Sequence, residues 1–317
     1  MAYNPATGFD PGAVQELRAL VEARLLYLTD TEEAYADNIS VFIKPEPHKQ
    51  MKLDEGRLRL ISAVSFVDTM VDRVLFGWLA KRVLTTVGST PVMVGWVPLF
   101  GQWRAFRERF SNKILCVDKS SWDWTVQAWM IDAFRLLIRR LAIGAAPWWV
   151  RAFEKRFDLL FKDARFQFRD GTVVQQGEAG VMKSGCFLTI ILNSLGQLLL
   201  HSVAILEMGV PDPGMPFAMG DDTVQELGEI DVEWYTQTLK LLGASPKYEV
   251  LQDVEFAGFF MSRDTCEPVY RAKHLFRLEY AAYLGEFCRS MQMLYANDEE
   301  SYGLFAKVAL NLAPDYY

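Results

Sequence analysis

The stretch Ala218-Met219-Gly220-Asp221-Asp222-Thr223-Val224 places two adjacent carboxylates between two apolar, strand-like segments. Because the glycine before the acidic pair permits a tight turn, this pattern predicts a β-hairpin with the aspartates at its tip. Adjacent aspartates repel each other, and such a pair is best tolerated where cations lie over it. On this stretch alone, a solvated acidic turn and a metal-binding hairpin are equally good interpretations, so the rest of the chain must decide between them.

The composition indicates a folded protein with a large core and segregated charge. The chain has 317 residues, of which 51% are hydrophobic and 13% aromatic, so it can form a large domain or several subdomains. Its formal net charge of −7 argues against a surface coated evenly with nucleic acid. Basic residues recur between residues 104 and 169, whereas acidic residues gather after Asp221. This layout fits a basic channel beside an acidic centre, and solvated helix faces would give the same pattern.

The sequence lacks the common signals of a zinc site or a membrane span. The 4 cysteines and 3 histidines are scattered without a CxxC pair, which predicts reduced thiols in a cytosolic setting. The first residues contain no signal-peptide core. The most apolar stretch, residues 187–206, includes Thr189 and Asn193, so we expect a buried helix and no transmembrane segment.

A second acidic signal follows an apolar strand over residues 114–117. Asp118 ends this strand, and Asp123 begins a predicted helix over residues 125–141, for which it could simply be the N-cap. Carboxylates at the C-terminal end of an apolar strand commonly hold a metal ion or a substrate. If the two acidic segments end neighbouring strands, they can hold two Mg²⁺ ions for in-line phosphoryl transfer. Mg²⁺ prefers such hard oxygen ligands, so the absence of His and Cys clusters fits this interpretation.

Basic residues lie near a short strand in the first quarter of the chain. Residues 41–49 read as an apolar strand followed by a proline-stiffened segment with Lys44 and Lys49. Residues 56–62 alternate, which places Arg57 and Arg59 on one face of a predicted strand. Such cations can bind a triphosphate, but this segment alone favours a solvated strand edge that its charges keep from aggregating.

A glycine-rich loop over residues 176–188 opens a long predicted helix. Gly185, next to Ser184, is expected to leave the backbone open to a ligand, and Thr189 and Asn193 fall on one helix face. The alternative is a flexible connector followed by a core helix with satisfied polar groups. Elsewhere the pattern predicts helices over residues 11–36, 67–84, 147–161, 232–242 and from 273 onward, hairpins over 166–174 and 254–261, and a loop that carries Lys247.

Together these segments resemble the RNA-dependent RNA polymerases of positive-strand RNA viruses, most closely the sobemovirus, polerovirus and barnavirus group. The resemblance runs from residue 42 to residue 260 and covers six motifs in the family's order. Residues 44–61 look like the fingers motif that contacts the incoming triphosphate, and residues 118–126 and 183–193 are similar to the first two palm motifs. Residues 218–222 are similar to the signature hairpin, Lys247 lies where the family has a proposed general acid, and residues 256–259 resemble the primer-grip hairpin.

The resemblance implies an α+β fold with right-hand polymerase architecture, in which an antiparallel palm sheet rests on helices between fingers and a small thumb. It assigns residues 1–113 to the N-terminal region and fingers, and residues 114–143 and 176–262 to the palm. Residues 144–175 would be a fingers insertion and residues 263–317 a reduced thumb. The chain is shorter than is usual for the family, and Glu178-Ala179 departs from the family's usual glycine-proline entry to the second palm motif.

The resemblance also implies roles for individual residues. Asp118 and Asp221 would bind two Mg²⁺ ions, replaceable by Mn²⁺, with Asp222 as a weaker ligand. Lys247 would protonate the pyrophosphate leaving group, with Lys240 as the alternative. Nucleotide and ribose binding would fall to Lys44, Arg57, Arg59, Asp123, Ser184, Gly185, Thr189 and Asn193.

The implied function is RNA-directed RNA polymerase activity in viral genome replication and transcription. RNA template, nascent strand and ribonucleoside triphosphates would be the partners, together with other viral replication proteins or a protein primer. The expected location is the host cytoplasm, within a membrane-associated replication complex. Two alternatives are a truncated or inactive polymerase-like RNA-binding factor and a reverse transcriptase. The second is disfavoured because Asp123 with Asn193 fits acceptance of the ribose 2′-OH.

Overall fold

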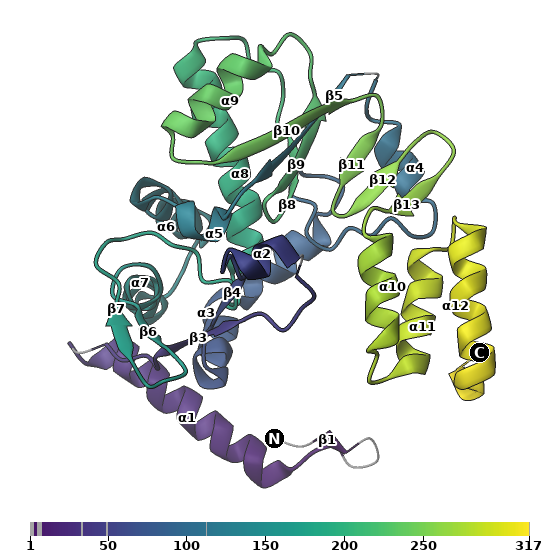
Figure 1. Cartoon of the computed structure of the whole chain (residues 1–317). Helices are drawn as coiled ribbons and strands as arrows, with labels where there is room; N and C mark the ends of the chain where they lie inside the picture. Colours follow the sequence, from purple (N-terminus) through teal and green to yellow (C-terminus); the bar gives the residue numbers. More distant parts are fainter. Residues whose placement is uncertain (1–2, 5–7, 33, 49, 112, 317) are drawn as a thin grey trace.

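The computed structural model describes residues 3–4, 8–32, 34–48, 50–111 and 113–316 of the chain (Figure 1). Lys49, one of the expected basic residues, lies outside the described residues. At the centre is a four-stranded antiparallel sheet, the palm sheet, in the order β10-β5-β9-β8. Its strands are β5 (Ile114–Lys119), β8 (Phe217–Met219), β9 (Asp222–Glu226) and β10 (Pro246–Leu251).

The predicted acidic hairpin is confirmed by the two strands β8 and β9. Met219 pairs with Asp222, and the chain turns at Gly220, which has a φ of 68°. This left-handed conformation suits glycine because a Cβ atom is disfavoured there. The strand before Asp118 is also confirmed, and its position beside β9 brings both acidic segments onto one sheet.

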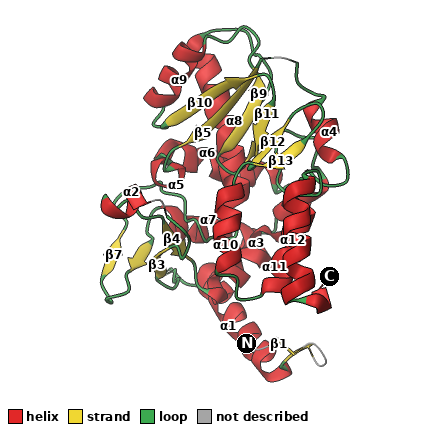
Figure 2. Ribbon diagram, turned by 45° about the vertical axis from the view of Figure 1, so that its right-hand side comes forward, coloured by secondary structure: helices red, strands yellow, loops and turns green. Residues whose placement is uncertain are grey.

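Helices cover one face of the palm sheet (Figures 1 and 2). On the other face, Ile114 and Val224 are buried against the aromatic residues around Phe106, whereas the end that carries Asp118 is accessible. In β5, Leu115, Val117 and Lys119 are buried, whereas Cys116 and Asp118 on the opposite face are more accessible. This alternation is the period of a strand with one covered face. The elements on the covered side are α5 (Trp122–Thr125), α6 (Ala128–Leu141), α8 (Thr189–Met208) and α9 (Val232–Leu241).

A second sheet, the fingers sheet, has the strand order β4-β3-β6-β7. Two distant segments meet in it, because β3 pairs in parallel with β6. The antiparallel pairing of β6 with β7 confirms the predicted hairpin around Asp170. Helices α1, α3 and α7 pack against one another beside this sheet. The elements of this region are α1 (Pro11–Asp30), β3 (Ile39–Ile43), α2 (Gln50–Asp54), β4 (Leu60–Ala63), α3 (Phe66–Thr85), α7 (Pro147–Phe161), β6 (Arg165–Gln167) and β7 (Val173–Gln175), with a short ladder of β1 (Tyr3–Asn4) and β2 (Gly8–Phe9) before them.

Buried ion pairs fix these helices. Arg156 on α7 donates to Asp72 on α3 at 2.6 Å, and Arg24 on α1 donates to the neighbouring Asp68. Arg156 and Asp72 are both nearly inaccessible to solvent. Loss of one partner would leave a buried charge without compensation, so these pairs specify how the helices pack.

An aromatic cluster joins the palm sheet to a three-stranded sheet and a group of C-terminal helices. Trp96 and Phe256 pack on Phe106 with ring centroids 5.0 and 5.3 Å away. The helices beyond this sheet, the thumb helices, have their own core around Tyr295 and Phe305. These elements are α4 (Gln102–Arg107), β11 (Val254–Phe256), β12 (Phe259–Met261), β13 (Cys266–Pro268), α10 (Arg271–Glu279), α11 (Leu284–Leu294), α12 (Glu299–Leu312) and the 3₁₀ helix η1 (Pro314–Tyr316).

Four local predictions were wrong. The helix expected over residues 125–141 is divided into α5 and α6, and Asp123 lies inside α5 rather than at the N-cap of the longer helix. Arg57 and Arg59 precede β4, which begins at Leu60, so they do not lie on one strand face. Lys247 lies in strand β10 instead of a loop. The helix over residues 11–36 ends at Asp30.

Helix α8 is long and apolar enough, by length and composition, to cross a bilayer. In its most apolar window, 56% of the helix is buried inside the fold. Its buried residues include Asn193, Ser194 and His201, each of which has a hydrogen-bond partner within the protein. These contacts are those of a core helix, as the sequence predicted.

Candidate active site

The two acidic segments meet at the accessible end of the palm sheet. Val117 on β5 is opposite Thr223 on β9, so the next pair along this antiparallel ladder is Asp118 and Asp222. Both aspartates line a cavity of about 320 Å³, with Lys247 and Tyr270 on its other walls. Asp221 lies beside them in the turn and is exposed. The structure therefore brings together the three predicted metal-binding residues.

Burial and mutual repulsion make Asp221 and Asp222 harder to ionise. Burial raises the pKa of Asp222 to about 6, and repulsion from Asp221 and Asp118 adds to this shift. The pKa of Asp221 is raised too, first by the surrounding protein atoms and then by Asp118, although its side chain remains open to solvent. A cation at this site would oppose both shifts because it stabilises the ionised carboxylates.

The donor set fits a divalent ion that is shared with a substrate. Among the described residues, no three His, Cys, Asp or Glu side chains are arranged to enclose one ion. Mg²⁺ commonly binds one or two protein carboxylates and completes its shell with water and substrate phosphates. Asp118, Asp221 and Asp222 suit that mode of binding, whereas they do not form a closed protein cage.

A buried lysine supports the carboxylates from the covered side of the sheet. Lys119 follows Asp118 and is 4% exposed, and its amine donates to Thr223 Oγ1 at 2.6 Å and to the Val117 carbonyl oxygen at 3.3 Å. Burial lowers the pKa of Lys119 to about 7, although the nearby aspartates act in the opposite direction. Lys119 was not predicted as a site residue, although its position directly after Asp118 could have indicated it.

The acidic turn is also held by a serine of α8. Ser194 Oγ accepts the backbone N–H of Gly220 at 2.8 Å and donates to the Ile190 carbonyl oxygen at 2.7 Å. The turn is thus fixed to a buried helix, which limits the positions that Asp221 can adopt. Ser194 was missed because its neighbour Asn193 was the expected site residue.

Asp123 and Asn193, the two residues expected to bind the ribose, contact each other although they are far apart in the chain. The Asn193 amide donates to Asp123 Oδ1 at 2.9 Å and accepts the Trp122 indole N–H at 2.9 Å. Burial raises the pKa of Asp123, the hydrogen bond from Asn193 lowers it, and the charge of Asp221 raises it. Asp123 therefore lies within electrostatic reach of the acidic turn that carries Asp221.

Gly185 lies where the loop before α8 meets strand β4. Its N–H donates to the Ser62 carbonyl oxygen on β4, and a Cβ atom at this position would lie 2.9 Å from that oxygen. Ser184 and Ser62 add reciprocal bonds, in which each backbone N–H donates to the other hydroxyl at 3.0 Å. Glycine is therefore required for close approach of the loop to the fingers sheet, and its role in nucleotide binding stays a prediction.

The rest of this loop is held by buried polar groups. Thr189 Oγ1 donates to the Lys183 and Cys186 carbonyl oxygens at 2.6 and 2.8 Å, so its hydroxyl points back into the loop. The Lys183 amine, which is fully buried, donates to Gln176 Oε1 at 2.5 Å and to the Val181 carbonyl oxygen at 2.8 Å. Ser184 and Thr189 are thus placed to support the site and make their described contacts within the protein.

The predicted fingers cations separate into two groups. Arg59 and Lys44 both bind the Glu46 carboxylate, at 3.0 and 3.1 Å. The charge of Arg59 acts to lower the pKa of both Asp123 and Asp221, so Arg59 lies within electrostatic reach of these carboxylates. Arg57 instead pairs with Glu55, and no described contact brings it to the carboxylates.

The predicted general acid lies at the cavity. Lys247 on β10 is directly opposite Asp118 on β5, and both residues line the same cavity. Lys240, the alternative, is an exposed residue on α9 and does not line it. The structure therefore favours Lys247 for a role at this site.

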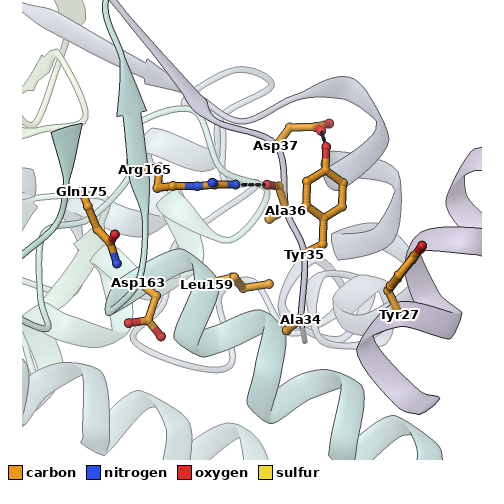
Figure 3. A pocket seen from close by; sticks show the side chains of 9 residues that line it. All are labelled: Tyr27, Ala34, Tyr35, Ala36, Asp37, Leu159, Asp163, Arg165 and Gln175. Carbon is orange, nitrogen blue, oxygen red and sulfur yellow. Dashed lines mark hydrogen bonds between the residues drawn. The ribbon is translucent and has the colours of Figure 1, made fainter. Parts of the chain in front are cut away.

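A larger hollow of about 620 Å³ lies elsewhere, between α1, α7 and the fingers sheet (Figure 3). Two of its charged groups, Asp37 and Arg165, already have partners within the protein. Asp37 accepts from the Tyr35 hydroxyl at 2.9 Å and pairs with Arg24 at 3.0 Å, and Arg165 donates to the Ala36 carbonyl oxygen at 3.3 Å. These contacts suit a structural role, so the palm cavity remains the candidate active site.

Comparison with known proteins agrees with this geometry. A family model described as viral RNA-dependent RNA polymerase matches residues 33–227, which is more than half of the chain. The chain belongs to the viral RNA-dependent RNA polymerase family. As the motifs predicted, similar proteins of this polymerase family come from sobemoviruses, poleroviruses and related viruses.

Three relatives illustrate the extent of the similarity. Replicase polyprotein P2AB of Southern cowpea mosaic virus is 34% identical over 282 residues, which cover 84% of this chain and 28% of that protein. Protein P1-P2 of Turnip yellows virus is 33% identical over 270 residues, covering 77% of this chain and 24% of that protein. Protein P2-P3 of Poinsettia latent virus is 29% identical over 299 residues, covering 86% and 26%. This chain thus spans about a quarter of the length of these relatives.

A solved structure confirms the predicted fold. The Sicinivirus 3Dpol RNA dependent RNA polymerase matches with a TM-score of 0.73 at 17% sequence identity. The match covers 99% of this chain and 69% of that one. This chain therefore has the α+β right-hand polymerase fold that its motifs implied.

Proposed function

We propose that this chain extends RNA on an RNA template by adding ribonucleoside triphosphates at the palm carboxylates. The observation that carries this proposal is the meeting of Asp118 with the Asp221-Asp222 turn, beside the Asp123–Asn193 pair. An acidic centre next to a pair of ribose-binding groups supports a reaction at the 3′ end of a ribonucleotide chain.

Asp118 and Asp221 would hold two Mg²⁺ ions, with Asp222 as a further ligand and Mn²⁺ as a substitute. When bound, such ions favour ionisation of the attacking 3′-hydroxyl and neutralise the charge that develops on the phosphates. Lys119 and Ser194 would act as positioning residues, because they fix β5 to β9 and the acidic turn to α8. A fixed array of carboxylates needs no rearrangement during the reaction.

Selection of the substrate falls to the groups that surround the carboxylates. Asp123 would accept a hydrogen bond from the ribose 2′-OH, and Asn193 would hold Asp123 in place for that contact. Arg59 and Lys44 would bind the triphosphate, for which the exposed Arg59 guanidinium beside the site is suited.

Lys247 would donate a proton to the pyrophosphate leaving group. Its place opposite Asp118 supports this role, because the bond to the leaving phosphate breaks beside the metal-binding carboxylates. A positioned ammonium group both offers a proton and stabilises the polyanion that departs.

We further propose the division into fingers (residues 1–113 and 144–175), palm (114–143 and 176–262) and thumb (263–317). The palm and fingers sheets and the thumb helices support this division. RNA template and nascent strand would occupy the space over the palm sheet. Three of the viral relatives bear the name replicase polyprotein, which supports work together with other viral proteins. We propose a membrane-associated complex of the host cytoplasm as the place of this work.

Extension of a hairpin RNA with labelled ribonucleotides tests this proposal. The wild-type chain is expected to lengthen the RNA in Mg²⁺ or Mn²⁺, and Asp221→Ala is expected to abolish extension while RNA binding persists. RNA binding by the wild-type chain without metal-dependent extension would contradict the proposal and indicate an RNA-binding factor instead. Extension that survives Asp221→Ala would contradict the assigned site.

A further inference from the structure

Glu46 has an unusual position for an acidic residue in a surface loop. Its side chain is 4% exposed, and three cations contact it: Lys44 at 3.1 Å, Arg59 at 3.0 Å and Lys273 at 3.4 Å. Burial by itself raises the pKa of Glu46, but the hydrogen bond from Lys44 and the charges of Arg59 and Lys273 outweigh it and hold the pKa at about 2. Glu46 is therefore ionised at neutral pH and shared among three positive side chains.

The backbone holds this junction together on the fingers side. The Lys44 N–H donates to the Arg59 carbonyl oxygen at 2.8 Å, and the Glu46 N–H donates to the Lys44 carbonyl oxygen at 2.9 Å. Pro45 and Pro47 flank Glu46 and restrict the backbone on both sides. The carboxylate is thus a fixed point against which the longer, flexible side chains of Lys44 and Arg59 are oriented.

The third cation belongs to the thumb helices. Lys273 lies on α10, and the loop between β3 and α2 reaches toward this helix (Figure 1). Among the ion pairs between described residues, Glu46–Lys273 is the one that joins the fingers segment to the thumb helices. Arg271, two residues earlier on α10, pairs within the thumb with Glu300.

We propose that Glu46 is a positioning residue that orients Lys44 and Arg59 for the triphosphate and, through Lys273, couples their placement to the thumb. This inference rests on the proposed function, because it takes a nucleoside triphosphate as the ligand of Lys44 and Arg59. Glu46 does not contact the substrate itself. Coupling of this kind is reciprocal: a thumb held against Glu46 favours triphosphate binding, and triphosphate binding favours that thumb position.

Charge alone and positioning predict opposite results for Glu46→Gln. Removal of a negative charge from beside a polyanion site should strengthen binding if Glu46 merely weakens the local positive potential. If Glu46 positions the two cations, the same substitution should weaken binding, because their side chains lose the acceptor that orients them. The sign of the change therefore decides between the two explanations.

Binding of inorganic tripolyphosphate, measured by calorimetry, is the first readout because it requires neither RNA nor turnover. Glu46→Gln and Lys273→Met are each expected to raise the dissociation constant by about fivefold or more. The double variant is expected to raise it by less than the product of the two single fold changes, because the two residues act through one contact. Glu46→Asp keeps the negative charge on a shorter side chain, so its dissociation constant is expected to lie between those of the wild type and Glu46→Gln. Matched controls are Glu55→Gln in the same fingers segment and Arg271→Met on the same helix, for which no change is expected.

Hydrogen exchange of α10 is the second readout and reports the thumb contact. Exchange is expected to rise in Glu46→Gln and Lys273→Met alike, and tripolyphosphate is expected to protect α10 in the wild type but not in Glu46→Gln. In nucleotide addition, Glu46→Gln is expected to raise KM for the ribonucleotide with a smaller effect on kcat.

Three results would overturn the inference: no binding of tripolyphosphate by the wild type, equal or tighter binding by Glu46→Gln, or unchanged affinity in Lys273→Met. Failure of the proposed function looks different. In that case the wild type would not extend RNA, whereas tripolyphosphate binding and α10 exchange would still change together in the variants.

Discussion

The Asp123–Asn193 pair gives the sharpest prediction about substrate choice. Asn193 is 6% exposed, and its amide bridges Asp123 and the Trp122 indole with two hydrogen bonds of 2.9 Å. Asn193→Ala removes both bonds, and an unsatisfied polar group costs about 1–3 kcal/mol where it stays buried. It also removes the hydrogen bond that lowers the pKa of Asp123, so this carboxylate becomes harder to ionise.

The expected consequence is a loss of discrimination between ribose and deoxyribose. A hydrogen bond from a substrate hydroxyl to an ionised, correctly placed Asp123 contributes about 1.5–3 kcal/mol, which corresponds to roughly 10- to 150-fold. Because Asn193→Ala releases Asp123, we expect the ratio of kcat/KM for a ribonucleotide over its 2′-deoxy counterpart to fall by about tenfold or more.

Single-nucleotide incorporation on an RNA hairpin measures this ratio directly. Gln197→Met is the matched control, since Gln197 lies one turn further along α8, is buried, and has neither side-chain amide atom hydrogen-bonded among the described residues. The control is expected to retain the wild-type ratio. If Asn193→Ala reduces incorporation of both nucleotides equally, the pair has only a structural role and the reasoning is refuted.

Three further predictions concern stability and can be checked by urea unfolding. Gly185→Ala places a Cβ atom 2.9 Å from a backbone oxygen of β4 and should cost about 1–3 kcal/mol, whereas Gly303→Ala, which meets nothing within 4 Å, should not destabilise the chain. Arg156→Met leaves Asp72 buried and unpaired and should cost about 3–5 kcal/mol, most of which a second change, Asp72→Leu, should restore. The pKa of Glu46 lies below its ordinary value, so its stabilising effect is present above pH 4.5 and is lost as pH falls toward about 2; the stability difference from Glu46→Gln should shrink over that range.

The sequence predicted best where local chemistry decides the structure. The Gly220 turn, the strand before Asp118 and the hairpin around Asp170 each depend on a glycine or an apolar run that can be read without knowledge of the fold. The resemblance assigned Asp123 and Asn193 to ribose binding, and the hydrogen bond between them places the two residues at one site.

Two of the wrong predictions share one cause, which is contact between segments distant in sequence. The helix after Asp123 is interrupted at Val126, whose carbonyl oxygen accepts the Val181 N–H from the loop before α8. Residues 246–251 lack an apolar run, and they form a strand because β5 offers them a partner edge. No local pattern around these residues reports such partners.

Supporting residues of the site were hidden for a related reason. Lys119 and Ser194 act through the backbone and side chains of other elements, and their types alone do not distinguish them from ordinary core residues. Glu46 lies within the fingers motif of residues 44–61, as do Lys44 and Arg59, but its third cationic partner, Lys273, lies more than 200 residues later on α10. Only the fold shows that these groups converge.

Templated addition of a single ribonucleotide tests the central claim most directly. On an RNA hairpin with one unpaired template base next to the 3′ end, the wild-type chain is predicted to add only the complementary ribonucleotide, to release pyrophosphate and to require a divalent metal ion. Asp118→Asn is predicted to reduce the rate by at least about 10³-fold, whereas Asp170→Asn, at the exposed tip of the β6–β7 hairpin, should not. Addition independent of the template base, or undiminished in Asp118→Asn, would contradict the account.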